Sequence, residues 1–161
     1  MYVRMQRAIG PIHRCRPSEV QVLPVNVSDF LEAFSRWARS RPDIEAVALV
    51  GSYAREAATE SSDVDLVILT SGPDRYLRDR SWVSAFGEPA GCREEDYGRV
   101  RSVRAFYGSG LEVEYGFTTP DWAEAPIDAG TLRVVADGMK VLHDPRGVIA
   151  RMQREVESRG E

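Results

Sequence analysis

The chain contains little cysteine, almost no lysine and no long apolar run. Cys15 and Cys92 are its two cysteines in 161 residues, and their separation does not match a metal-binding cysteine motif. A chain of this length can bury a sizeable core without disulfides, so we expect a reducing, cytoplasmic location. No apolar stretch approaches the roughly 20 residues that a membrane-spanning helix needs, so we expect no membrane association.

Positive charge is scarce and is carried almost entirely by arginine. Of the 21 basic residues only Lys140 is a lysine, and the formal net charge is -4. A protein that binds a long nucleic acid needs a basic footprint for the phosphates. The composition therefore argues against such a ligand and favours a small molecule or another protein. A hydrophobic fraction of 43% is ordinary for a compact globular domain.

The order of the hydrophobic patterns predicts one α/β domain over residues 25–161, preceded by an extension, residues 1–24. The extension is basic but lacks the apolar core of a signal peptide. Helical spacing of apolar residues after a capping Ser28 predicts the first helix. The expected helices are 28–40, 53–59, one opened by Gly72-Pro73 and reaching Phe86, and 146–158; the expected strands are 44–50, 63–70, 99–107, 111–117 and 139–143. We expect a loop over 87–98 whose acidic residues, 94–96, are solvated.

Two short segments carry the pattern with the most chemical content. Gly51 and Ser52 follow one apolar run, and Asp63 and Asp65 open the next. Side chains alternate across a strand, so the two aspartates share a face with Cα atoms roughly 7 Å apart. The glycine lets the backbone approach a phosphate closely, and Ser52 is expected at the start of a short helix whose free N–H groups favour an anion.

Two carboxylates at this spacing are typical of a magnesium site. Mg²⁺ prefers oxygen ligands and takes one or two carboxylates together with substrate phosphates. A two-metal site places its ions about 3.5–4 Å apart. Asp63 and Asp65 therefore predict two Mg²⁺ ions that hold a nucleoside triphosphate. Each motif alone is also common as ordinary turn chemistry, so the prediction depends on their combination.

The pattern Gly51-Ser52, ten residues, then Asp63-Val64-Asp65-Leu66 resembles the signature of the DNA polymerase beta-like nucleotidyltransferase superfamily. The residues of this motif are most similar to those of the minimal and the aminoglycoside nucleotidyltransferases. The resemblance implies an α/β (α+β) nucleotidyltransferase fold, with a mixed sheet of about four or five strands and helices chiefly on one face.

The resemblance also implies a third carboxylate on a later strand. Glu112 and Glu114 lie on one face of the segment 111–115, and we favour Glu114 because Glu112 adjoins the turn 108–110. The family usually has aspartate here, so glutamate is a departure. The implied catalytic and metal-binding residues are Asp63, Asp65 and Glu114, and the implied nucleotide-binding residues are Gly51, Ser52 and Arg55. Arg55 is also open to being a surface salt bridge.

The implied reaction is transfer of a nucleoside monophosphate from a Mg²⁺-bound triphosphate, most simply ATP, to the hydroxyl of a small molecule, with release of pyrophosphate. Two alternatives remain open: a minimal-nucleotidyltransferase antitoxin that binds or modifies a protein partner, and a catalytically silent nucleotide-binding domain. Only residues 115–161 follow Glu114, so we expect an acceptor pocket that is small, shared in a homo-oligomer, or on a partner protein. Tyr107, Tyr115 and Trp122 either line that pocket or belong to the core.

Overall fold

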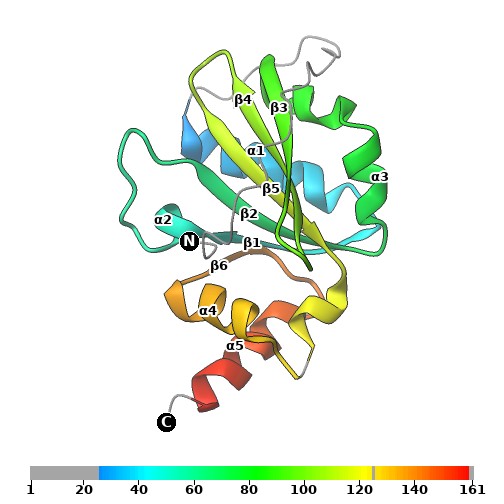
Figure 1. Ribbon diagram of the computed structural model, residues 1–161, viewed down its shortest axis with the longest axis vertical. Coiled ribbons are helices and arrows are strands. Elements are labelled where there is room, and N and C mark those ends of the chain that lie inside the picture. Colours follow the sequence, from blue (N-terminus) through cyan, green and yellow to red (C-terminus); the bar gives the residue numbers. More distant parts are fainter. Residues whose placement is uncertain (1–25, 125, 160–161) are drawn as a thin grey trace.

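A computed structural model describes residues 26–124 and 126–159, and it is built around one six-stranded sheet (Figure 1). The expected extension, residues 1–24, with Cys15, lies outside the described residues. In chain order the helical elements are α1 (Val27–Arg39), α2 (Gly51–Ala54), α3 (Pro73–Arg78), η1 (Ser81–Phe86), η2 (Pro120–Ala123), α4 (Ala129–Asp137) and α5 (Val148–Arg159). The strands are β1 (Ile44–Val50), β2 (Val64–Thr70), β3 (Pro89–Asp96), β4 (Arg101–Tyr107), β5 (Glu112–Thr118) and β6 (Lys140–His143).

The sheet is mixed, and its strand order is β3-β4-β5-β2-β1-β6. Strands β2 and β5 pair in parallel, whereas the other neighbouring pairs are antiparallel. The expected mixed α/β architecture is therefore confirmed, with six strands rather than four or five and with helices on both faces rather than chiefly on one. The parallel pair matters for the site, because it brings the acidic ends of β2 and β5 side by side.

One face of the sheet carries the larger hydrophobic core. Alternate residues of β2 and β5 pack there against α1, α3 and η1; the cluster includes Phe30, Phe34, Leu66, Ile68, Trp82, Phe86, Tyr107, Tyr115 and Phe117. Helix α1 begins one residue earlier than expected, because the side chain of Asn26, not Ser28, accepts a hydrogen bond from the Asp29 N–H at 2.8 Å. Tyr107 and Tyr115 are core residues that hydrogen-bond to each other at 2.7 Å.

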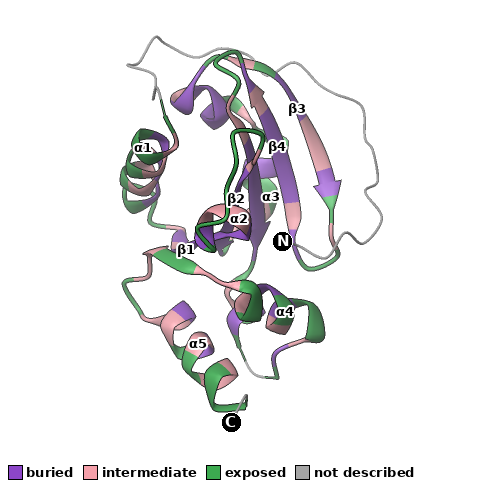
Figure 2. Cartoon of the chain, turned by 90° about the vertical axis from the view of Figure 1, so that its left-hand side faces the viewer, coloured by how far each residue is buried: buried purple, intermediate pink, exposed green. Residues whose placement is uncertain are grey.

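The opposite face carries a smaller core over β1 and β2 (Figure 2). Ala46, Ala48, Val67 and Leu69 pack there against η2, α4 and α5, and Trp122 is buried among them. Alternation along β2 continues this face from Val67 and Leu69 back to Asp65. The acidic residues of the predicted site therefore lie beyond the edge of this second core.

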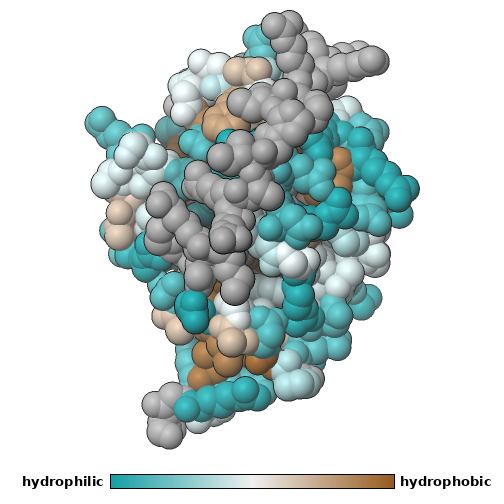
Figure 3. Space-filling model, viewed as in Figure 1, coloured by the Kyte–Doolittle hydropathy of each residue, from teal (hydrophilic) through white to brown (hydrophobic). Residues whose placement is uncertain are grey.

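Several elements differ from the sequence-based expectations. The predicted loop 87–98 is largely strand β3, the predicted helix 53–59 is replaced by the shorter α2, and α4 was not anticipated. The helix expected after Gly72-Pro73 is divided into α3 and η1. Within the described ranges, every helix is too short or too polar to cross a bilayer. Figure 3 shows mainly hydrophilic residues on the face it presents, with small hydrophobic patches between them.

Candidate metal and nucleotide site

Three carboxylates meet at one point of the sheet, two from β2 and the residue that precedes it and one from β5. Asp65 lies directly beside Glu114 in the parallel pairing of β2 with β5, and Asp63 immediately precedes β2. One carboxylate oxygen from each of Asp63, Asp65 and Glu114 lies within 4.8 Å of the others, a separation at which one divalent cation could contact all three. The expected third carboxylate is therefore beside the two aspartates.

Gly51 makes room for this cluster. It follows β1 with a φ of +74°, a left-handed conformation that strains other residues. A Cβ atom at this position would overlap the Oδ2 atom of Asp65. The glycine is needed both for the turn into α2 and for the close approach of that turn to the carboxylate.

The carboxyl of Asp65 is in an unusual electrostatic environment. Burial, with the negative charges of Glu114 and Asp63, raises its pKa to about 9. Its Oδ1 atom and the Oε1 atom of Glu114 are buried and have no hydrogen-bond partner among the described residues. Buried carboxylate oxygens without partners are rare in folded proteins, so a positively charged ligand is the natural partner for them.

Arg104 of β4 is a central member of the site that the sequence reasoning missed. Its side chain is only 2% exposed, and it pairs with Glu114 at 2.8 Å and with Asp63 at 2.5 Å. The antiparallel register of β4 with β5 places it directly beside Glu114. It also contacts Glu112 at 2.9 Å, so that residue belongs to the rim of the same cluster.

Glu95 of β3 fixes Arg104 from the other side. Its Oε1 atom accepts a hydrogen bond from Arg104 Nε at 2.9 Å, and Arg93 and Tyr97 also donate to this carboxylate. Burial alone would raise the pKa of Glu95, but the hydrogen bonds from Arg104 and Tyr97 outweigh it and lower the pKa to about 2. The expectation that the acidic residues 94–96 are solvated is therefore wrong for Glu95, which is 2% exposed.

The other predicted contacts lie around α2, which touches both β1 and β2. Ser52 is half-buried in its first turn, and Arg55 is exposed at its end. Within the part of the chain that the structure describes, Arg55 has no ion-pair partner, whereas Lys140 pairs with Glu56 at 3.1 Å. The salt-bridge interpretation of Arg55 therefore finds no support in these residues.

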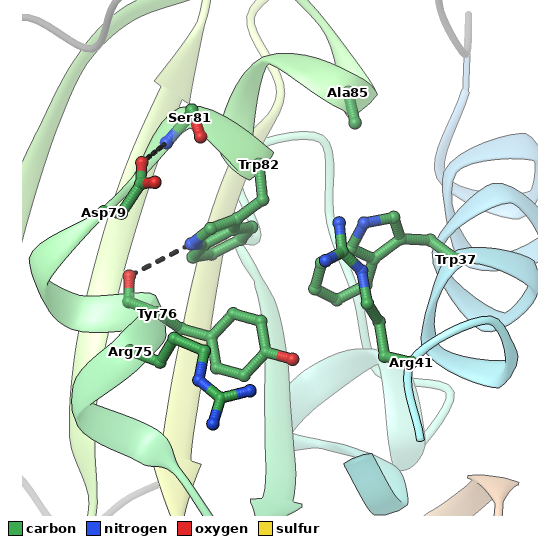
Figure 4. A pocket seen from close by; sticks show the side chains of 8 residues that line it. All are labelled: Trp37, Arg41, Arg75, Tyr76, Asp79, Ser81, Trp82 and Ala85. Carbon is green, nitrogen blue, oxygen red and sulfur yellow. Dashed lines mark hydrogen bonds between the residues drawn. The ribbon is translucent and has the colours of Figure 1, made fainter. Parts of the chain in front are cut away.

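A separate pocket of about 410 Å³ lies on the opposite face of the sheet, between α1, α3 and η1 (Figure 4). Trp37, Tyr76 and Trp82 form its apolar walls, and Arg41 stacks over the Trp37 ring at 4.9 Å. None of the site carboxylates lines it. The pocket is therefore distinct from the acidic cluster.

Comparisons with known proteins agree with this geometry. The sequence model of the family described as "Nucleotidyltransferase domain" matches residues 27–106, which run from α1 to the end of β4. No curated protein matches the chain. The match ends before Glu114, so it does not include the expected third carboxylate, which lies on β5.

Three solved structures are similar at low identity. An aminoglycoside 6-adenyltransferase from Bacillus subtilis is 15% identical, with a TM-score of 0.49, over 60% of this chain and 36% of that one. A toxin-antitoxin structure with AMP-PNP is 13% identical, with a TM-score of 0.46, over 81% and 86%. The Cid1 poly(U) polymerase is 17% identical, with a TM-score of 0.40, over 69% and 40%.

The family match includes the elements that carry Gly51, Asp63, Asp65 and Arg104. Gly51 lies in α2, Asp63 immediately precedes β2, Asp65 lies in β2 and Arg104 lies in β4. The matched segment therefore contains this part of the cluster, whereas Glu112 and Glu114 follow it. Residues 27–106 of this chain belong to the nucleotidyltransferase domain family.

Proposed function

We propose that this protein transfers a nucleoside monophosphate from a Mg²⁺-bound nucleoside triphosphate, most simply ATP, to the hydroxyl of a small molecule. The observation that carries this proposal is the convergence of Asp63, Asp65 and Glu114 within 4.8 Å. In a domain of this family, a carboxylate cluster is suited to hold a metal-bound triphosphate.

The residues present fit a magnesium ion. Asp65 Oδ1 and Glu114 Oε1 are buried oxygen donors without a hydrogen-bond partner among the described residues, and oxygen is the donor that Mg²⁺ prefers. Asp63, less buried than either, would present its carboxylate to the same ion. When bound, the metal supplies positive charge that offsets the charge of the triphosphate.

The chain's own groups position the reactants. Gly51 keeps the turn close to Asp65, and we assign Ser52 and Arg55 to the phosphates, because one follows the glycine and the other is an exposed, unpaired cation in the described residues. Glu114 orients the acceptor hydroxyl and takes its proton, which makes the attacking oxygen a better nucleophile. Its position inside the sheet, at 3% exposure, keeps that carboxylate fixed.

A catalytically silent nucleotide-binding domain is the second candidate. The observation in its favour is that Arg104 already pairs with Asp63 and Glu114, two of the three candidate ligands. If these ion pairs exclude the metal, the fold remains but the transfer does not occur. A protein acceptor, as an antitoxin would have, remains an alternative to the small molecule.

The test is a pyrophosphate-release assay with each of the four nucleoside triphosphates, a panel of small hydroxylated acceptors and candidate protein acceptors. We expect release that requires Mg²⁺, one triphosphate and one acceptor class, and that is lost in Asp65→Asn. Asp137→Asn, at an exposed position on α4, is the matched control and should retain activity. Metal-dependent binding of triphosphate without release on any acceptor would favour the silent domain.

A further inference from the structure

We propose that this site binds one divalent cation and that Arg104 permanently provides the positive charge that a second ion would otherwise bring. The inference depends on the proposed function, because it concerns the metal requirement of the same site. It replaces the expectation of two Mg²⁺ ions, which the two aspartates alone suggested.

The guanidinium of Arg104 already occupies oxygens that a second metal would need. Its Nη1 atom lies 2.5 Å from Asp63 Oδ2, and its Nη2 atom lies 2.8 Å from Glu114 Oε2. Among the buried side-chain oxygens of the described residues, Asp65 Oδ1 and Glu114 Oε1 are the cluster atoms without a hydrogen-bond partner. These two atoms suit one ion that bridges β2 and β5, whereas a second ion on Asp63 would compete with the guanidinium for the same carboxylate.

Arg104 is fixed on the side away from the metal. Its Nε atom donates to Glu95 Oε1 at 2.9 Å, and Glu95 is itself held by Arg93 at 2.8 Å and by the hydroxyl of Tyr97. Moving the guanidinium out of the cluster would leave the carboxylate of Glu95, which is 2% exposed, with fewer partners to balance its charge. The side chain therefore stays in place when a cation approaches.

The fixed charge of Arg104 disfavours a second ion in the cluster. Asp63, Asp65, Glu112 and Glu114 face a single guanidinium, while the charge of Glu95 is shared by Arg104 and Arg93. A second divalent ion would lie beside a fixed cation and be repelled by it.

Counting bound Mn²⁺ tests the inference without reference to turnover. The full chain, freed of metal by chelation, is titrated with MnCl₂, and the free ion is measured by its paramagnetic resonance signal. We expect one Mn²⁺ for each chain in the wild type and in Arg104→Lys, which keeps the charge. We expect two in Arg104→Met, which removes it.

Arg101→Met is the matched control, because Arg101 lies on the same strand but pairs with Glu94 and Asp74 instead of the site carboxylates. It should bind one ion. Two ions in the wild type, or one in a folded Arg104→Met, would overturn the inference and leave the proposed function standing. No Mn²⁺ in the wild type would overturn both. If Arg104→Met does not fold, the number of ions bound by the wild type still tests the inference.

Discussion

Replacing Asp65 with asparagine should stabilise the metal-free protein by an amount that grows with pH. Asp65 is 8% exposed, and burial together with the charges of Glu114 and Asp63 raises its pKa to about 9. Between about pH 4 and pH 9 the carboxyl of Asp65 is therefore protonated in the folded state, whereas it is ionised in the unfolded chain. The contribution of Asp65 to the free energy of unfolding is fully present below the pKa of the unfolded chain. It is lost as the pH rises towards the pKa of the folded state. Asparagine has no such proton to hold.

The size of the effect follows from the width of that pH window. Within it, each pH unit removes about 1.4 kcal/mol from the wild type relative to the variant. Between pH 5 and pH 7 the free energy of unfolding of Asp65→Asn should therefore rise, relative to the wild type, by about 3 kcal/mol. That is a large share of the roughly 5–15 kcal/mol that keeps a domain folded.

Urea unfolding of both proteins at pH 5, 6 and 7, with chelator present, measures this difference directly. Asp137→Asn removes a carboxylate at an exposed position on α4, and its difference from the wild type should stay nearly constant across the same pH values. A difference for Asp65→Asn that is equally flat would refute the reasoning, because Asp65 would then bind no extra proton on folding. Added Mg²⁺ should stabilise the wild type but not Asp65→Asn.

Two further predictions concern neighbouring residues. Gly51→Ala should destabilise the fold by about 1–3 kcal/mol in urea unfolding and should weaken Mn²⁺ binding, since φ is +74° and the new Cβ overlaps Asp65 Oδ2. Gly98→Ala, also at positive φ but in open space, should leave Mn²⁺ binding unchanged. Glu114→Gln should lower turnover by about 10²–10⁴-fold and should also weaken Mg²⁺-dependent triphosphate binding, because Glu114 Oε1 is one of the oxygens assigned to the ion. Glu112→Gln, on the exposed rim, should stay near wild type in both. Steady-state kinetics and triphosphate titration compare the two variants, and the reverse order would reassign the third carboxylate.

The elements that the sequence predicted well are those whose local pattern and tertiary packing agree. The apolar run 44–50 is β1 from end to end, and the turn 108–110 lies between β4 and β5 as expected. Helix α1 also matches, although its cap is Asn26, because capping depends on a backbone conformation that Ser28 and Asn26 could each have adopted. Strand β3 was missed because Pro89, Gly91 and three successive acids in it favour a loop locally.

That error in β3 also explains why the sequence revealed only part of the site. Asp63, Asp65 and Glu114 stand in recognisable apolar contexts, so their convergence could be predicted. Arg104 could not, because arginine is common in this chain and only the pairing of β4 with both β3 and β5 buries it. Its burial in turn requires Glu95, which lies in the segment mistaken for a loop. A sequence can thus indicate which carboxylates gather, while the cation that balances them depends on strand pairings that no local pattern encodes.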